Sequence, residues 1–428
     1  MGCAACPMAQ SRLHMRSQPD EVAMQPHVSR WRLALFAFFF LPGLSMASWV
    51  TRTPAIRDRI GASIGEMGLV LFGLSVGAMT GILVSGALVS RFGTRPVTRA
   101  GLWLGVASMA TISLGVVLGD MRLVACGLGF FGLGMGVSEI AINVDGAAVE
   151  CLIRKPVLHT LHGCFSLGTV CGALVGLGLT KLAFPVEWHL SIIAVLGAAM
   201  ILTFQSAVPP GTARVASAAS TATETGVGRQ PTSAWQDPRL ALIGLIVLGM
   251  ALAEGAANDW LPILMVDEYG FSQVSGSLVF LAFAAAMTVG RFGGGYFLHR
   301  FGRAAVIRGS ALLGAIGVAI VILAENSILG GTAVILWGLG ASLGFPVALS
   351  AAGDSGPNPA DRVKVVAMGG YVAFLVGPPL LGFVGEHHGL RVALMIVFAA
   401  VVLAGLAAPS VRPPKPIQPT ATDVRTSA

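Results

Sequence analysis

Charge is scarce in this 428-residue chain. Lys, Arg, Asp and Glu make up 11% of the sequence, whereas a soluble domain usually has about a quarter. Hydrophobic residues make up 55%, and the mean hydropathy is +0.80. Apolar runs of about 20 residues, the length that crosses a bilayer as a helix, recur along most of the sequence. The composition excludes a soluble globular protein and predicts an all-α membrane protein with many crossings.

Motifs for enzyme chemistry are also lacking. The sequence has no Walker loop for nucleotide phosphates, no Gly-x-Ser-x-Gly elbow in a suitable context and no cluster of metal ligands. The six cysteines are scattered, most of them in or near apolar runs, which argues against a disulfide framework. We therefore expect a protein that is not an enzyme, is not driven by ATP, and binds no metal and no cofactor.

Breaks between the apolar runs predict twelve membrane-spanning helices. The expected spans are 32–54, 65–89, 98–118, 122–148, 159–181, 186–208, 239–266, 275–298, 304–324, 329–351, 363–385 and 390–409. A stretch rich in Ala, Ser, Thr and Gly separates the sixth span from the seventh, and such a composition forms a flexible linker. The predicted organisation is a disordered tail, a six-helix bundle, a linker, a second six-helix bundle and a disordered tail, at 1–30, 31–208, 209–237, 238–410 and 411–428.

Basic residues predict the orientation in the membrane. With a cytoplasmic N-terminus, the inside segments carry about 20 Lys and Arg and the outside segments carry about six. This bias places both termini in the cytoplasm. It also accounts for the net charge of +7 without an anionic partner, so we expect the chain to contact the lipid bilayer and no nucleic acid.

The two halves of the sequence repeat. The stretches Met79–Arg95 and Thr288–Arg303 share the pattern G-x-x-x-x-R-F-G, about 209 residues apart. This pattern predicts two related bundles that arose by duplication. Transporters built from repeats bind their cargo at the interface between the repeats, near the middle of the membrane.

The first of these loops, G-A-L-V-S-R-F-G-T-R at 86–95, resembles the signature loop between helices 2 and 3 of the major facilitator superfamily. Its counterpart at 295–303 sits between helices 8 and 9, as in that family. The resemblance covers essentially the whole chain. It is greatest to the YbjJ type of bacterial inner-membrane transporter, through stretches such as A-I-N-V-D-G-A-A-V-E and G-L-G-A-S-L-G-F-P, and weaker to fucose permease-like symporters.

The resemblance implies two pseudo-symmetric six-helix bundles in a monomer of the bacterial inner membrane. It also implies a structural role at the cytoplasmic face for the residues that match the signature: Gly86, Arg91, Gly93, Arg95, Gly295, Arg300, Gly302 and Arg303. The family's loop acid is replaced by Ser90 and His299. The arginines remain available to bind helix-end carbonyls or lipid phosphate.

Two Glu-x-x-x-Asn pairs lie near the middle of predicted spans. Glu139 and Asn143 are in the fourth span, and Glu254 and Asn258 are in the seventh. Residues four apart share a helix face, and a charged side chain at mid-membrane costs about 2.5–3.5 kcal/mol on insertion scales. The resemblance implies that both pairs face a central cavity, where a carboxyl group can carry a proton and an amide can bind a polar cargo. The alternative is hydrogen-bonded packing without coupling.

Further polar residues extend this hypothesis. Asp145, nearer the cytoplasm, is a candidate for cargo or proton binding. Arg52 and Asp259, toward the outer ends of helices 1 and 7, are a candidate periplasmic gate, although Arg52 alone also fits an interfacial anchor. Arg291 fits a structural ion pair with an acid of its own bundle. Trp49 and Trp260 fit the aromatic belt at the outer membrane face better than a cargo site.

The sequence therefore predicts a secondary transporter that moves a small polar solute by alternating access, coupled to protons. One alternative is a membrane sensor or scaffold with a transporter fold. A proton-antiporting exporter is the other. The polar groups named above suit sugars, amino acids, peptides and acidic metabolites alike, so the sequence does not identify the cargo.

Overall fold

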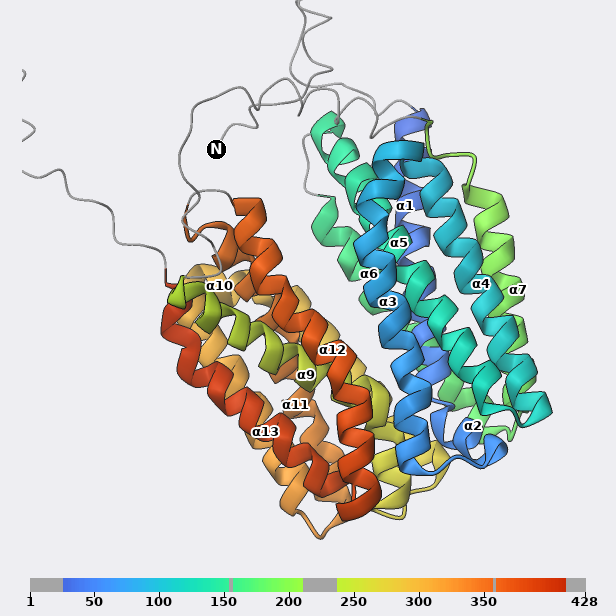
Figure 1. Ribbon diagram of the computed structural model, residues 1–428, viewed down its shortest axis with the longest axis vertical. Coiled ribbons are helices and arrows are strands. Elements are labelled where there is room, and N and C mark those ends of the chain that lie inside the picture. The colour runs from blue at the N-terminus through green and yellow to red at the C-terminus, as the bar shows by residue number, and fades with distance from the viewer. Residues whose placement is uncertain (1–25, 154–156, 211–236, 357–358, 413–428) are drawn as a thin grey trace, which may run out of the picture.

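A computed structural model describes residues 26–153, 157–210, 237–356 and 359–412. The predicted tails at 1–30 and 411–428 and the linker at 209–237 lie almost entirely outside these residues. The described chain is helical throughout and forms two bundles (Figure 1). The all-α fold predicted from the composition is therefore confirmed.

The helices follow the predicted spans closely. The first bundle contains α1 Pro26–Val50, α2 Thr53–Ile60, α3 Ile64–Phe92, α4 Thr94–Leu118, α5 Met121–Ile153, α6 Leu158–Lys181 and α7 Val186–Phe204. The second contains α9 Pro238–Asp267, α10 Gln273–Leu323, α11 Ser327–Gly353, α12 Pro359–His388 and α13 Leu390–Ala407, followed by a short 3₁₀ helix at Ala408–Val411. The sequence did not predict α2, a short helix after the first crossing.

Eleven of the described helices are long and apolar enough to cross a membrane. The longest, α10, has 51 residues and contains both the eighth and the ninth predicted spans. Its backbone leaves the helical conformation at Gly302, where φ is +77° and ψ is 167°. The helix α10 therefore contains two crossings separated by the turn at Gly302, and the twelve predicted crossings are all present.

The sharp turn at Gly302 has a counterpart in the first bundle. Gly93, between α3 and α4, has φ +86° and ψ 169°. Residues with a Cβ atom rarely adopt a positive φ, so both turns require glycine. The two glycines are 209 positions apart, the interval of the sequence repeat, and the repeated motif therefore encodes the same turn twice.

Glycines also bring neighbouring helices into close contact. A Cβ atom on Gly132 of α5 would lie 2.1 Å from the Leu74 carbonyl oxygen of α3, and one on Gly77 of α3 would lie 2.0 Å from the Gly129 carbonyl oxygen of α5. The α1–α6 pair is built the same way, since Cβ atoms on Gly43 or Gly168 would each lie 2.2 Å from a carbonyl oxygen of the other helix. Small residues at such positions are typical of membrane helix packing.

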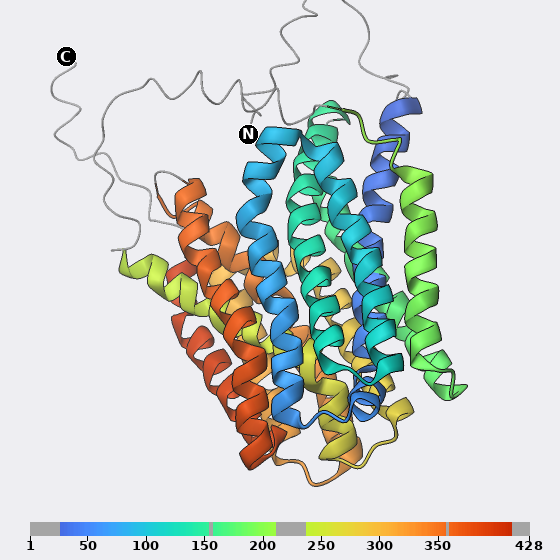
Figure 2. The ribbon, with the colours of Figure 1, turned by 45° about the vertical axis from the view of Figure 1, so that its right-hand side comes forward.

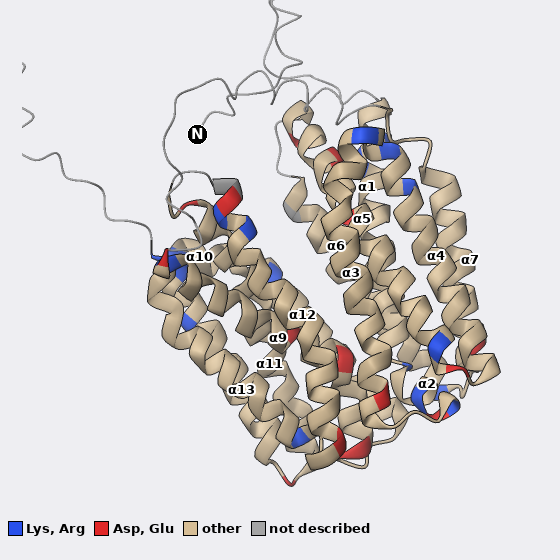
Figure 3. Ribbon diagram, viewed as in Figure 1, with Lys and Arg blue, Asp and Glu red and all other residues tan. Residues whose placement is uncertain are grey.

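The two bundles touch at one end and diverge toward the other (Figures 1 and 2). We call the diverging end, where α1 begins and α13 ends, the termini side, and the opposite end the far side. Charged residues gather at these two ends, and few lie along the helices between them (Figure 3). This distribution suits an apolar membrane around the middle of the helices.

The glycine contacts generate a prediction for stability. Gly132→Ala places a methyl group against the α3 backbone, so we expect a loss of about 1–3 kcal/mol through overpacking. Gly105→Ala in α4 is the matched control, because its added methyl group meets no atom within 4 Å. Thermal unfolding in detergent should show a lower Tm for Gly132→Ala only, and equal Tm values for the two variants would contradict the packing account.

Candidate functional site

Glu139 lies in the middle of α5 and is exposed in spite of that position. Its carboxylate is within electrostatic range of the Tyr371 hydroxyl on α12, in the other bundle. The side chain therefore points at the bundle interface. Exposure of a residue that faces the other bundle means that the two bundles leave room around it. That Glu139 faces a central cavity for cargo or protons stays a prediction.

The two amides of the predicted site are partly buried. Asn143 lies one turn after Glu139 on α5, and Asn258 lies one turn after Glu254 on α9. Within the described part of the chain, neither side chain has a hydrogen-bond partner. Both retain donor and acceptor capacity for a polar molecule.

Glu254 forms an ion pair that joins two helices of the second bundle. Arg291 of α10 donates from Nη2 to Glu254 Oε1 over 2.8 Å, and the side chains are 27% and 17% exposed. The other terminal nitrogen of Arg291 donates to Ser166 Oγ of α6 over 3.3 Å. Arg291 thus neutralises Glu254 and also bridges to the first bundle. The sequence predicted an acidic partner for Arg291 but missed Ser166, a serine without any charge pattern around it.

Glu139 and Glu254 therefore meet different partners at the same interface. Glu139 faces α12 and is exposed, whereas Glu254 is held by α10. No contact between the two carboxyl groups is found in the described structure. The site has one carboxyl without a counter-ion and one paired carboxyl, rather than the two equivalent acids that the sequence suggested.

Asp145 lies outside this site. It is fully buried, and its Oδ1 accepts a hydrogen bond of 2.8 Å from Thr94, the first residue of α4. Asp145 and Thr94 correspond to Asp354 and Arg303 of the second half, each 209 positions later. Arg303 forms an ion pair with Asp354 at the end of α11. Asp145 therefore fastens the signature loop to α5, which corrects its prediction as a cargo or proton site.

The signature loops have similar surroundings in the two halves. Arg91 lies over the Phe92 ring at 5.3 Å, and Arg300 lies over the Phe301 ring at 5.7 Å. Gly86 and Gly295 are exposed, and Arg95 is partly buried beside the turn at Gly93. Arg303 binds a carboxylate rather than a helix-end carbonyl. Asp354 thus supplies an acidic partner from outside the loop, which the loop sequence alone does not indicate.

The predicted pair of Arg52 and Asp259 does not form in this structure. Arg52 donates to Thr180 Oγ1 near the end of α6 over 2.9 Å, and to the carbonyl oxygen of Phe184 in the loop that follows α6. It is 5% exposed, so it is neither a gate to the second bundle nor an anchor in the headgroup region. Asp259 is 7% exposed on α9. The error has a simple cause: the terminal nitrogens of Arg52 bind acceptors within its own bundle.

Other polar contacts join the bundles at the far side. Arg57 of α2 binds both carboxylate oxygens of Asp267, at the end of α9, and this hydrogen bonding raises the pKa of Arg57 above its ordinary value. Further contacts cross the interface nearby: Asp58 with Gln273, the Gly65 amide with Glu386, Ser277 with the Thr51 carbonyl, and Ser75 with the Phe374 carbonyl. We call this set the far-side contacts. They close the end at which the bundles touch.

The tryptophans predicted for an aromatic belt are inside the protein. Trp49 and Trp260 are 1% and 2% exposed, so neither lies in the headgroup region. Trp337 is fully buried and donates from its indole nitrogen to the Ala253 carbonyl oxygen over 3.1 Å, which fixes α11 against α9. All three serve packing, and the belt predicted for Trp49 and Trp260 is wrong.

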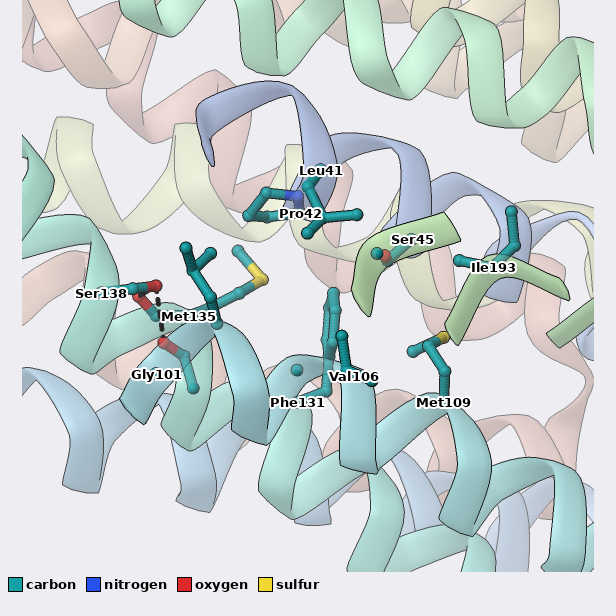
Figure 4. Close-up of a pocket in the computed structure, with 14 residues that line it drawn as sticks. Leu41, Pro42, Ser45, Gly101, Val106, Met109, Phe131, Met135, Ser138 and Ile193 are labelled. Atoms are coloured by element: carbon teal, nitrogen blue, oxygen red, sulfur yellow. Dashed lines mark hydrogen bonds between the residues drawn. The ribbon is translucent and has the colours of Figure 1, made fainter. Parts of the chain in front are cut away.

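A small pocket lies inside the first bundle, between α1, α4, α5 and α7. Figure 4 shows Leu41 and Pro42 on one side of it and Val106, Phe131 and Met135 on the other. The only polar side chains that line it are those of Ser45 and Ser138, and the latter already donates to the Gly134 carbonyl oxygen. The pocket has no charged group, and it is separate from the polar site at the bundle interface.

The far-side contacts generate a prediction about access. Arg57→Gln removes the ion pair with Asp267, so we expect the far side to open more often. A cysteine placed at Ser277, which is fully buried among these contacts, should then react faster with a membrane-impermeant maleimide in a background without the native cysteines. Arg59→Gln is the matched control, since Arg59 approaches Glu187 of its own bundle. Equal labelling rates in the two backgrounds would show that the ion pair does not control access.

Comparison with known proteins agrees with this architecture. Residues 160–364 match the Major Facilitator Superfamily. An uncharacterized MFS-type transporter of Yersinia pestis is 30% identical over 386 residues, which cover 89% of this chain and 95% of the relative. An uncharacterized transporter of Sinorhizobium fredii is 29% identical over 388 residues, with 89% and 98% covered.

A solved structure has the same fold. The crystal structure of the nucleoside transporter NupG has a TM-score of 0.67 and 15% sequence identity, and the match covers 89% of this chain and 98% of that one. The finer resemblance to YbjJ-type and fucose permease-like transporters stays a prediction, because these comparisons do not distinguish such groups. The chain belongs to the major facilitator superfamily, and it is a secondary transporter of the membrane rather than an enzyme.

Proposed function

We propose that this protein moves a small polar solute across the bacterial inner membrane by alternating access, and that protons drive the movement. In this proposal the termini side faces the cytoplasm, as the distribution of basic residues favours. The structure then corresponds to an inward-facing state, with the far-side contacts closing the periplasmic end. The observation that carries the proposal is the exposure of Glu139 at an interface that it shares with Tyr371.

Glu139 is the proposed coupling residue. An ionised carboxylate is stable while water reaches it, but enclosing it between the bundles without a counter-ion costs several kcal/mol. A neutral carboxylic acid avoids this cost. Closure of the termini side is therefore easier once Glu139 has taken up a proton. This difference links the proton to the conformational change, as coupling requires.

Arg291, Asn143 and Asn258 are the proposed cargo contacts. Arg291 already reaches across the interface to Ser166, so a solute that replaces this serine can accept a hydrogen bond from the guanidinium group. The two amides add donors and acceptors from opposite bundles. This combination suits a solute with hydroxyl, carbonyl or carboxylate oxygens.

The coupling proposal predicts the behaviour of Glu139→Gln. A thermal-shift screen with neutral sugars, amino acids and aromatic carboxylic acids first identifies a stabilising solute. In proteoliposomes, we expect the wild type to carry protons with this solute, as measured by an enclosed pH-sensitive dye. We expect Glu139→Gln to exchange the solute without proton movement and without a response to an imposed pH gradient.

Asp361→Asn is the control for this experiment, because Asp361 is an exposed carboxylate at the start of α12. It should behave like the wild type. If Glu139→Gln still carries protons with the solute at the wild-type ratio, Glu139 is not the coupling residue. A wild-type protein that transports the solute without any proton movement would reject proton coupling altogether.

The ion pair between Glu254 and Arg291 predicts a coupled effect on stability. Glu254→Gln leaves Arg291 without its counter-charge, and breaking a buried pair in this way costs about 3–5 kcal/mol, less where solvent reaches the pair. The double variant with Arg291→Gln removes both charges and should recover part of the loss. Thermal unfolding of the two single variants and the double variant measures the loss of stability and its partial recovery. Strictly additive changes in Tm would show that the two side chains do not interact.

A further inference from the structure

Asp259 is an acidic residue that takes part in none of the ion pairs and hydrogen bonds of the described structure. It lies on α9 and is only 7% exposed. Its carboxyl group has no hydrogen-bond donor and no cation among the described residues. Buried polar groups nearly always have partners, so an unpartnered carboxyl group inside a membrane protein requires an explanation.

The charged and titratable groups around Asp259 are engaged elsewhere. The elements packed against α9 are α1, α2, α10, α11, α12, α13 and the 3₁₀ helix at Ala408–Val411, and neither α11 nor the 3₁₀ helix has a titratable residue. On the others and on the connecting loops, the groups toward the far side that contact a partner are Arg52 with Thr180, Arg57 with Asp267, Asp58 with Gln273, Arg59 with Glu187, Glu268 with Leu390, Tyr269 with Val321, Arg291 with Glu254, Glu386 with Gly65, His387 with Phe383, His388 with His387 and Arg391 with Ala324. Tyr371 is within electrostatic range of Glu139, and Glu325 is exposed in the loop before α11.

Among the described residues, no cation forms an ion pair with Asp259. Moving an ionised carboxylate from water into this buried position is unfavourable, and no ion pair offsets the cost. A carboxylic acid carries no net charge and avoids most of this cost. We infer that Asp259 is a second proton-binding site, and that it holds its proton in the conformation seen here. This inference rests on the proposed proton coupling and adds a site on the periplasmic half of the protein.

The position of Asp259 suits exchange with the periplasm. It is eight residues before Asp267, so it lies about 12 Å from the end of the helix, and Glu254 lies about 20 Å from that end. The far-side contacts, with Arg57 and Asp267 among them, cover this end. When they separate, periplasmic water reaches Asp259 and its proton can exchange. The carboxyl O–H bond breaks as water takes the proton and becomes hydronium. In the reverse step an O–H bond of hydronium breaks, the carboxylate regains a proton and water is left.

Two carboxyl groups then divide the task between the two sides of the membrane. Asp259 is covered in this conformation and meets water when the far side opens. Glu139 is exposed in this conformation and is covered when the termini side closes. The two sites occupy opposite bundles, and each is open to water in the state in which the other is covered.

Infrared difference spectroscopy tests the protonation of Asp259 without any cargo. Purified protein in nanodiscs at neutral pH should show the carbonyl-stretch band of a protonated carboxylic acid, and Asp259→Asn should lose it. Asp361→Asn is the control, because Asp361 is an exposed carboxylate at the start of α12, outside the far-side contacts, and it should keep the band. If Asp259→Asn leaves the band unchanged, Asp259 is ionised and the inference is wrong.

A second variant covers the case in which Asp259→Asn does not fold. Asp259→Glu keeps the carboxyl group, so the band should remain but shift in frequency, and an unshifted band overturns the inference. The outcome is independent of Glu139. If Glu139→Gln still moves protons, the proposed coupling at Glu139 is rejected, but the infrared band of Asp259 is unaffected. If Asp259→Asn keeps the band, the inference about Asp259 is rejected, but the transport result for Glu139→Gln is unaffected.

Discussion

The cost of an ionised side chain inside a membrane governs this structure. Most charged residues lie at the two ends of the helices, where water and headgroups solvate them (Figure 3). Four that lie within the membrane-spanning helices are treated in three ways. Arg291 and Glu254 neutralise each other, Glu139 is exposed between the bundles, and Asp259 is buried without a counter-ion among the described residues. These three solutions define where a proton and a polar solute can be held.

The same constraint explains how the two bundles fit together. Within each bundle, glycines bring helix backbones into contact and leave little space for water, as between α3 and α5. Between the bundles, polar contacts dominate at the far side, and Arg291 reaches Ser166 in the middle. Polar contacts between bundles can be exchanged for contacts with water at little net cost. The packed bundles can therefore move as units while the interface between them opens and closes.

Much of the fold could be predicted from the sequence, because span length and the repeated loop are local signals. The twelve crossings and the duplicated turns at Gly93 and Gly302 follow from them. Side-chain partners across helices are not local, and here the predictions were less accurate. The Arg52–Asp259 pair was wrong because Thr180 and the Phe184 carbonyl lie closer, and Asp145 was misplaced because the loop turns back onto α5.

The central claim is that a proton on Glu139 permits the termini side to close. Pulsed electron paramagnetic resonance measures this directly, with spin labels at positions 90 and 364 on the diverging ends of α3 and α12. We expect acidification to shift the wild type toward short distances. Glu139→Gln, which is neutral at every pH, should show the short distances throughout. If Glu139→Gln instead responds to pH as the wild type does, another group controls the closure and the account is wrong.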